Sequence, residues 1–499
     1  MKKLSTVALV IVFVASAFTF SAFAAETTFT GTYRIRAYNE FNFDKKLEDT
    51  RAIFPGHDNA QHDGWFDQRF RLVITHKRSE YLKAVIRIDI VEDTWGQQRN
   101  LRMNDSAANF SPRAYLEFTF PKIGTFTVGK FSETYGHGLA FSDSGSGTIS
   151  LTGARWVNAW GPISVSVLYA KVADRVTIGS NNPEYNWDAN LYAMNLKITL
   201  IENNLVELFG GYLQDNDSDG ASGLGGILRN SWAWNSNGVG AYSADIGFVG
   251  IAYTGTIADM IEIMFENSYI FGLANPHVVP PTMTVVGRST TIQGWNIYAD
   301  VSYYNNLLRV GAAFIMGSGQ HHFWGINQYQ NLNMNYISQD NFVLSNILVG
   351  GGGGDNSIWW DGSFGQDNIE NITAIKLYFA INPIEKLTLT TSVTWAKWTE
   401  KVGRNTLGTR ATLVTSKGSA YRHPAAAYGN YNYQSWDTSD DLGWEIDFGF
   451  SYEIMEGLTY SFNMGVLFTG DSWDYERADG TRGDWGEIWS ITNALTYTF

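Results

Sequence analysis

The stretch that decides the fold is GEIWSITNALTYTF, residues 486–499, at the end of the chain. From Trp489 onward, apolar or aromatic side chains occupy most alternate positions and finish with Tyr497 and Phe499, while serine and threonine fill most positions between them. A period of two is typical of a β-strand with one apolar face. The chain therefore ends on a half-buried strand whose apolar face continues to the last residue.

The same alternation recurs upstream. In the segment that starts at Leu442, aromatic and aliphatic side chains share one face, while the carboxylates of Glu445 and Asp447 lie on the other. We count about eighteen segments of this kind, with sixteen as the alternative, and both even numbers occur in bacterial membrane barrels. In water such long apolar faces would aggregate, whereas in a bilayer they would form the outer wall.

The connections between these segments alternate between short and long. The short ones, with hairpin-turn residues, are 79–80, 121–124, 161–162, 202–204, 305–306, 382–385 and 455–457. The long polar ones are 39–67, 94–112, 132–149, 175–186, 215–243, 272–290, 318–370, 401–441 and 470–486. Short turns on one rim and long loops on the other predict a transmembrane antiparallel β-barrel. A soluble β-sandwich is the alternative, but its connections need not alternate in length.

Composition and the first residues agree with export. Residues 1–24 combine a basic start, an apolar run and the small-residue site Ala22-Phe23-Ala24, which predicts a cleaved signal peptide followed by one barrel domain, residues 25–499. The chain has no cysteine, so disulfides, thiolate metal sites and lipid-modified cysteine are excluded. Its net charge of −14 argues against nucleic acid as a partner.

The terminal strand resembles the C-terminal signature of bacterial outer-membrane β-barrels. That resemblance implies an outer-membrane location and a role for Phe499 as the signal that the barrel-assembly machinery binds. The run DLGWEIDFGFSYEIMEGLTYSFNMGVLFTGD, residues 441–471, is similar to the penultimate hairpin of alginate-export-like barrels and related porins, which implies eighteen strands. Resemblance to porins implies a homotrimer, and resemblance to alginate-export-like barrels implies a monomer.

A barrel of this size leaves an aqueous lumen, so we expect the functional residues on the inner face. Alternation places basic side chains there at Arg34, Arg36, Arg69, Arg71, Lys83 and Arg87. It places acidic side chains there at Glu117, Glu207, Glu262, Glu266, Asp300, Glu445 and Asp447. Opposed basic and acidic walls would create a transverse field that favours small polar solutes. The alternative is that these charges merely line a wet lumen without selectivity.

One internal stretch is more specific. The run TFTVGKFSETYGHGLAFSDSGSGT, residues 125–148, resembles the strand end and opening of the third loop of porins, which folds into the channel and narrows it. The resemblance implies that Lys130 lies on the channel wall and that Glu133 and Asp143 are constriction acids facing the arginines. The alternative is an ordinary surface loop rich in glycine and serine.

A cation site is the other candidate. Asp215, Asp217 and Asp219 precede Gly220 with the spacing of a calcium-binding loop, but Gly226 stands where a bidentate glutamate belongs. The site is therefore either a loop Ca²⁺ site or a solvated acidic loop. No cofactor is otherwise expected, and because no G-x-S-x-G motif or nucleophile-base pair is visible, we expect no enzyme.

These observations predict an outer-membrane porin, a passive diffusion channel for small hydrophilic solutes. Its surroundings would be outer-membrane lipid and lipopolysaccharide. The alternatives are a substrate-specific sugar channel or a polysaccharide-export channel of the alginate-export-like kind, and, more distantly, an outer-membrane hydrolase. The sequence leaves open the solute, the ion preference and the oligomeric state.

Overall fold

The computed structural model describes residues 25–42, 62–95, 109–143, 151–173, 188–215, 242–276, 290–319, 331–333, 337, 342–349, 369, 371–400, 439–473, 475–476, 482–483 and 486–499. The expected signal peptide and most of the long loops lie outside these residues. Within them, no helix has the length and apolar character needed to cross a membrane.

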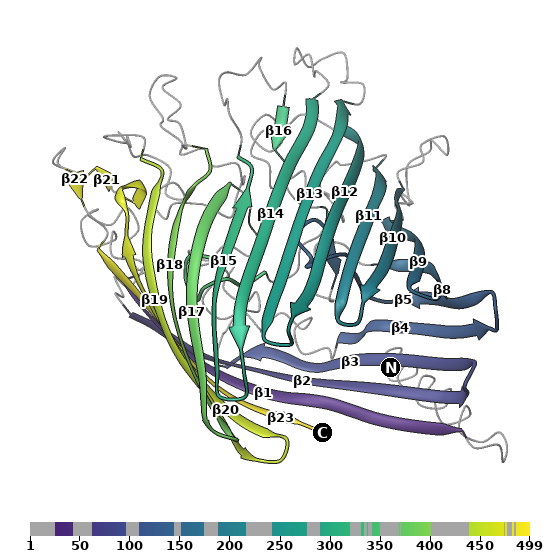
Figure 1. Cartoon of the computed structure of the whole chain (residues 1–499), viewed down its shortest axis with the longest axis horizontal. Coiled ribbons are helices and arrows are strands. Elements are labelled where there is room, and N and C mark those ends of the chain that lie inside the picture. Colours follow the sequence, from purple (N-terminus) through teal and green to yellow (C-terminus); the bar gives the residue numbers. More distant parts are fainter. Residues whose placement is uncertain are drawn as a thin grey trace, which may run out of the picture.

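The described chain forms one large antiparallel sheet that closes on itself (Figure 1). Its wall strands are β1 (Glu26–Phe41), β2 (His62–Ser79), β3 (Leu82–Thr94), β4 (Asn109–Phe120), β5 (Gly124–Lys130), β8 (Thr152–Trp160), β9 (Ile163–Ala173), β10 (Ala189–Ile201), β11 (Asn204–Asp215), β12 (Tyr242–Ile257), β13 (Ile261–Pro276), β14 (Thr290–Tyr304), β15 (Leu308–Gly317), β17 (Ile372–Ile384), β18 (Leu387–Trp398), β19 (Asp441–Met455), β20 (Leu458–Thr469) and β23 (Glu487–Thr498). Each pairs with the next, and β1 also pairs with β23, which closes the barrel.

Of the 19 strands in this sheet, the three-residue β16 (Asn331–Asn333) is an addition that runs parallel to β14, so eighteen form the wall. The smaller elements are β6 (Glu133–Thr134), β7 (Ser142–Asp143), β21 (Tyr475–Glu476), β22 (Arg482–Gly483) and the 3₁₀ helix η3 (Asp471–Trp473). The prediction of an eighteen-stranded antiparallel barrel is confirmed. In Figure 1, β12–β15 rise steeply while β1–β4 run almost across the view, which shows the tilt of strands around a closed barrel.

Tight turns join the strands at one rim, as the sequence predicts, and they include one that the sequence did not reveal. Residues 258–260 connect β12 to β13, and Ala258 and Asp259 both adopt positive φ, at 52° and 55°. Two consecutive positive φ values are the geometry of a tight hairpin turn, which glycine or asparagine usually provides. Alanine gives no such signal, and the turn was therefore missed.

The outward face carries three bands of exposed apolar side chains. Judged from position along the strands, the middle band is aliphatic and includes Leu116, Val128, Val167, Met194, Leu208, Val249, Ile251, Val301, Ile375, Leu377, Val393 and Ile446. An aromatic band near the long-loop rim includes Phe66, Trp95, Tyr169, Tyr192, Tyr212, Tyr269, Phe271, Trp295, Trp444, Phe468 and Trp489. A second aromatic band near the turn rim includes Phe29, Tyr81, Phe120, Trp160, Tyr303, Tyr452, Tyr497 and Phe499. Aromatic girdles on both sides of an aliphatic band are typical of barrels that cross a bilayer.

The last residue completes the seam between β1 and β23. The backbone N–H of Gly31 donates to the carbonyl of Phe499 at 3.0 Å, and the N–H of Phe499 donates to the carbonyl of Gly31 at 3.1 Å. The aromatic ring of Phe499 lies over Gly31, where a Cβ atom would come within 2.7 Å of the ring and 2.5 Å of the Arg71 carbonyl. Glycine is therefore required under the terminal ring.

Gly31→Val should impair closure of the barrel, because its side chain would displace Phe499 and meet the backbone of β2. We expect less of the compact species that resists heat in detergent gel electrophoresis, and slower refolding into lipid vesicles. Ile35→Val, on the same outward face of β1, should behave like wild type. Equal refolding of both variants would contradict this account of the seam.

Candidate functional site: the barrel interior

A row of basic side chains lies on the inner face of β1 to β4. The strand register places Arg34 directly opposite Arg69, and Arg87 directly opposite Arg113. The sequence had not singled out Arg113. Like charges directly opposite one another destabilise a sheet, so their presence here is a cost that the fold itself does not require.

Carboxylates beside this row pair with several basic residues, including Arg87 of the row itself, which lies 3.4 Å from Asp89. Arg71 holds Asp89 in a two-point ion pair, with nitrogen-to-oxygen distances of 2.7 and 3.0 Å, and Lys83 pairs with Glu117 at 2.8 Å. Arg36 likewise binds Asp67, and both side chains are buried. The six basic residues expected in the pore thus lie on one continuous inner surface together with Arg113. We call this surface the basic wall and define it as Arg34, Arg36, Arg69, Arg71, Lys83, Arg87 and Arg113.

The segment after β5 turns into the barrel. We call residues 131–143 the inner hairpin, because β6 and β7 pair through Glu133 opposite Asp143 and Thr134 opposite Ser142. Tyr135 and Phe141 are fully buried and pack against each other with tilted rings, at a centroid distance of 5.1 Å. Phe141 also stacks on Phe248 of β12, at 5.6 Å. The expectation that this loop folds inward agrees with these contacts for residues 131–143.

Two carboxylates of the opposite wall hold the tip of the inner hairpin. Glu266 of β13 accepts a hydrogen bond from the backbone N–H of His137. Glu207 of β11 accepts one from the N–H of Gly136 at 3.4 Å, another from the Asn195 amide at 2.9 Å, and pairs with Lys197 at 3.4 Å. The hairpin therefore reaches from β5 to β13. Glu207 and Glu266 were expected on the pore surface, but both are buried against the inner hairpin.

At the base of the inner hairpin, Glu133 forms an ion pair with Arg155 of β8. The sequence predicted that Glu133 would face arginines, but it did not identify Arg155 as the partner. The side chain of Asp143 lies outside the described residues. Lys130 lies on the outward face, because it shares the parity of exposed Val128 and pairs with Ala114 and Thr152. Its expected place on the channel wall is therefore corrected.

A second stretch of chain enters the barrel from the loop between β15 and β17. We call residues 342–349 the inner segment. The N–H groups of Ile347 and Leu348 donate to the two carboxylate oxygens of Glu445, each at 2.7 Å. The Asn346 amide donates to Asp447 at 2.9 Å, and the Lys376 ammonium donates to the Leu344 carbonyl. Sequence alternation placed both acids on the inner face but gave no sign of this partner.

The inner hairpin and the inner segment come close to each other beside Tyr298 of β14. The ring of Tyr298 lies between His137 of the hairpin, at 5.3 Å, and Phe342 of the segment, at 5.5 Å. The N–H of Ile337 donates to the carbonyl of Ala140 at 2.8 Å. Together the two stretches form a bridge from β5 to β20, on the side of the barrel away from the basic wall.

The inner face beneath this bridge is apolar, which the sequence did not lead us to expect. Leu168, Leu191, Leu213, Ile246 and Phe248 are all buried there with the aromatic residues of the inner hairpin. Strands β9 to β12 carry apolar residues on both faces, a pattern that indicates cover on both sides. That pattern was the available sequence signal for an occupied lumen.

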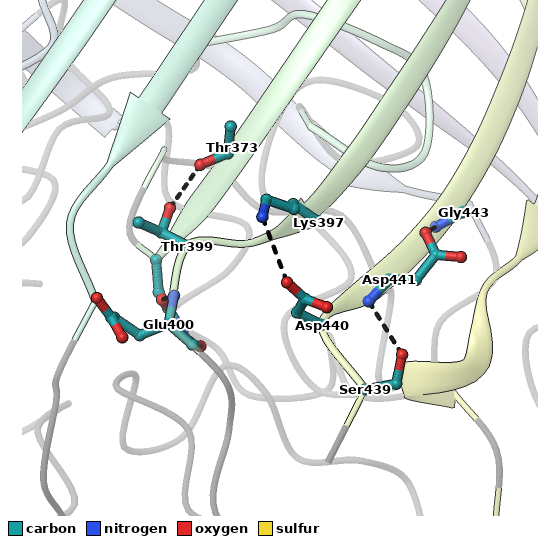
Figure 2. A network of polar contacts seen from close by, with 9 residues as sticks. Thr373, Lys397, Thr399, Glu400, Ser439, Asp440, Asp441 and Gly443 are labelled. Atoms are coloured by element: carbon teal, nitrogen blue, oxygen red, sulfur yellow. Dashed lines mark hydrogen bonds and ion pairs between the residues drawn. The ribbon is translucent and has the colours of Figure 1, made fainter. Parts of the chain in front are cut away.

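A cluster of polar contacts lies where β17, β18 and β19 adjoin the long loops (Figure 2). Lys397 of β18 points at Asp440, with 3.3 Å between nitrogen and oxygen. The hydroxyls of Thr373 and Thr399 are 2.8 Å apart and tie β17 to the end of β18. Because these contacts lie where the long loops leave the barrel, they hold the ends of β17, β18 and β19 together.

The remaining predicted site residues are placed as follows. Glu262 of β13 pairs with Arg309 of β15, and Asp300 of β14 accepts a hydrogen bond from the Tyr378 hydroxyl at 2.7 Å. Asp215 is buried at the end of β11, while Asp217 and Asp219 lie outside the described residues. Among the described residues, no group of three or more potential metal ligands occurs. The loop Ca²⁺ site stays a prediction.

The ion pair at the base of the hairpin should respond to pH. Burial raises the pKa of the Glu133 carboxyl above its ordinary value, and neighbouring Arg155 only partly offsets this. As pH falls, Glu133 therefore takes up its proton earlier than an ordinary glutamate and leaves the Arg155 charge uncompensated. Anion preference, measured as reversal potential against pH, should rise on acidification. Glu133→Gln should show, already at neutral pH, the stronger anion preference that wild type shows only in acid. If Glu133→Gln instead keeps the wild-type dependence of the reversal potential on pH, the assignment is contradicted.

No protein-family model and no curated protein matches the chain. Among solved structures, it is similar to Pseudomonas aeruginosa OpdQ, with 11% identity over 95% of this chain and 97% of that chain at a TM-score of 0.45. It is also similar to OccK5 (OpdH) of the same organism, with 12% identity, 95% and 98% coverage, and a TM-score of 0.45. It is similar as well to OmpT, an outer membrane protein of Vibrio cholerae solved in trimer form, with 11% identity over 96% of this chain and 100% of that chain and a TM-score of 0.37.

Proposed function

We propose that the protein is a passive diffusion channel of the outer membrane for small hydrophilic solutes, with a preference for anions. The observation that carries this proposal is a row of facing arginines on the inner face of a closed eighteen-stranded wall. Arg34 lies opposite Arg69, and Arg87 lies opposite Arg113. Asp67, Asp89 and Glu117 neutralise part of the basic wall, which still carries more basic than acidic side chains among these residues. An excess of positive charge along a channel raises the local concentration of anions. Neither a filled eight-stranded barrel nor a soluble sandwich would use such a row.

The position of the inserted stretches supports the same conclusion. The bridge contacts the wall from β8 to β20, so the passage is narrowed from one side and bordered by the basic wall on the other. Arg71 and Lys83 remain partly accessible, with 26% and 34% of their side chains exposed. A solute that enters the barrel therefore passes side chains that offer charged hydrogen-bond donors.

The surroundings follow from the outer surface. The aliphatic band would lie in the hydrocarbon region and the two aromatic bands at its interfaces, with lipopolysaccharide around the long-loop rim. Export would use the expected signal peptide, and the assembly machinery would bind the terminal strand with Phe499. We propose no catalytic role and no cofactor.

Solute flux into liposomes tests the function directly. Purified protein is incorporated into vesicles, and osmotic swelling is followed with a neutral monosaccharide, the matching sugar acid, and a long acidic polysaccharide. We expect entry of both small solutes, with the sugar acid faster, and exclusion of the polymer. Passage of the polymer would favour an export channel, and no swelling with either small solute would contradict the proposal.

A further inference from the structure

We propose that Glu445 and Glu266 are positioning residues that fix the width of the passage by anchoring the inner segment and the inner hairpin to the wall. The inference rests on the proposed channel function and deepens it. The strands of the wall enclose the lumen, and these two buried carboxylates determine how much of the lumen the inserted stretches fill.

Glu445 makes the more demanding contact. Its side chain is fully buried, at 0% exposure, and each of its oxygens accepts one backbone N–H of the inner segment at 2.7 Å. Asp447 on the same strand holds Asn346 and the Ser392 hydroxyl, both at 2.9 Å. Lys376 supplies the nearby positive charge while donating to the segment itself. Wall side chains thus satisfy several polar groups of the segment.

Glu266 makes the corresponding contact with the inner hairpin. It is also at 0% exposure, and the backbone N–H groups of His137, Leu139 and Ala140 point at its carboxylate. Its Oε2 accepts the His137 bond, while Oε1 has no hydrogen-bond partner among the described residues. Gly136 lies so close that a Cβ atom there would be 2.7 Å from Oε2. The tip of the hairpin is therefore shaped around one oxygen.

These contacts have an energetic consequence. A buried N–H group without an acceptor is destabilising, so removal of the carboxylate favours a state in which the inserted stretch leaves the wall and its N–H groups bind water. The strands of the wall keep their own ladder hydrogen bonds in either case. Loss of an anchor should therefore widen the passage without unfolding the barrel.

The difference between the two anchors gives a sharp test. Glutamine has one acceptor oxygen and one NH₂ group, so Glu445→Gln sets a donor against a backbone N–H, whereas Glu266→Gln can still present an oxygen to the hairpin. We expect Glu445→Gln to raise single-channel conductance by about twofold or more, since a stretch of chain leaves the lumen. Glu266→Gln should raise it less than Glu266→Leu. Glu453→Gln, on the same strand and face as Glu445 but without a described hydrogen bond to residues 342–349, is the matched control.

A reversible tether separates positioning from a general structural role. The chain has no cysteine, and a Cβ atom at Gly465 would lie 3.0 Å from the Cβ of Asn346. A disulfide needs roughly 3.5 to 4.5 Å between Cβ atoms, so a small shift allows one. In the Glu445→Gln background, Asn346→Cys with Gly465→Cys should restore wild-type conductance when oxidised and lose it again on reduction. Asn346→Cys alone should not respond to reductant.

The outcomes are distinct. Wild-type conductance in Glu445→Gln, or no response of the tethered variant to oxidation, would overturn the proposal. If Glu445→Gln fails to give the heat-resistant barrel, Ile347→Pro removes the same hydrogen bond from the segment side and leaves the wall intact. A wild-type conductance in that variant would also overturn it. If the wild-type protein itself carries no current, the proposed function has failed rather than the anchoring.

Discussion

Replacement of Arg34 and Arg69 by glutamate should reverse the ion preference of the channel from anions to cations. The two arginines lie directly opposite each other on β1 and β2, so the change replaces two adjacent positive charges by two negative ones at the surface that borders the passage. With a tenfold salt gradient, the reversal potential of a perfectly selective channel is about 59 mV. We expect the wild-type protein to give a potential smaller than this on the anion side, and the variant to give a potential of the opposite sign.

The control for this experiment keeps the same change in net charge outside the lumen. Arg78 and Lys122 lie at the turn rim, and both would be replaced by glutamate. If long-range charge alone mattered, this variant would behave like the first. We expect it to keep the wild-type potential. Unchanged reversal potentials in Arg34→Glu with Arg69→Glu would contradict the basic wall as a determinant of selectivity.

The second large effect concerns the outer surface. Leu377 lies in the middle of β17 on the outward face and is 60% exposed. An arginine at the midplane of a barrel's lipid-facing surface costs about 2 to 4 kcal/mol. Leu377→Arg should therefore lower the free energy of unfolding by about that amount when the protein is denatured from lipid vesicles.

Depth provides the control. Ile384 lies at the turn end of the same strand and is 57% exposed, so its exposure matches that of Leu377 while its expected depth does not. Near an interface the cost of arginine falls to about 0 to 1 kcal/mol. If both substitutions have the same small effect, the outward face lies in water and the assignment of the aliphatic band to a bilayer is wrong.

The wall of the barrel could be predicted because it depends on local pattern. Alternation along segments such as Leu442 onward fixes the face of each side chain, and turn residues such as Asn203 and Gly457, both with positive φ, mark the reversals. The turn at Ala258 lacked that signal and was missed. Even so, the strands on both sides of it were identified, since their alternation stops and starts again there.

The contents of the barrel were predicted less well, for a physical reason. Whether Glu445 lines open water or binds the N–H groups of Ile347 and Leu348 depends on where a distant loop lies. Alternation gives the face of a residue but not its partner. The resemblance carried by VGKFSETYG, residues 128–136, did predict an inward loop, whereas residues 342–349 carry no comparable motif. The apolar inner positions of β9 to β12 were the one signal that something must cover them.

The most direct test of the whole account is a single-channel recording. Wild-type protein, purified in detergent and shown to give a heat-resistant barrel, is added to a planar lipid bilayer in symmetric and then asymmetric salt. The account predicts discrete current steps that rise linearly with voltage and a reversal potential on the anion side. A correctly folded and inserted barrel that passes no current would contradict it.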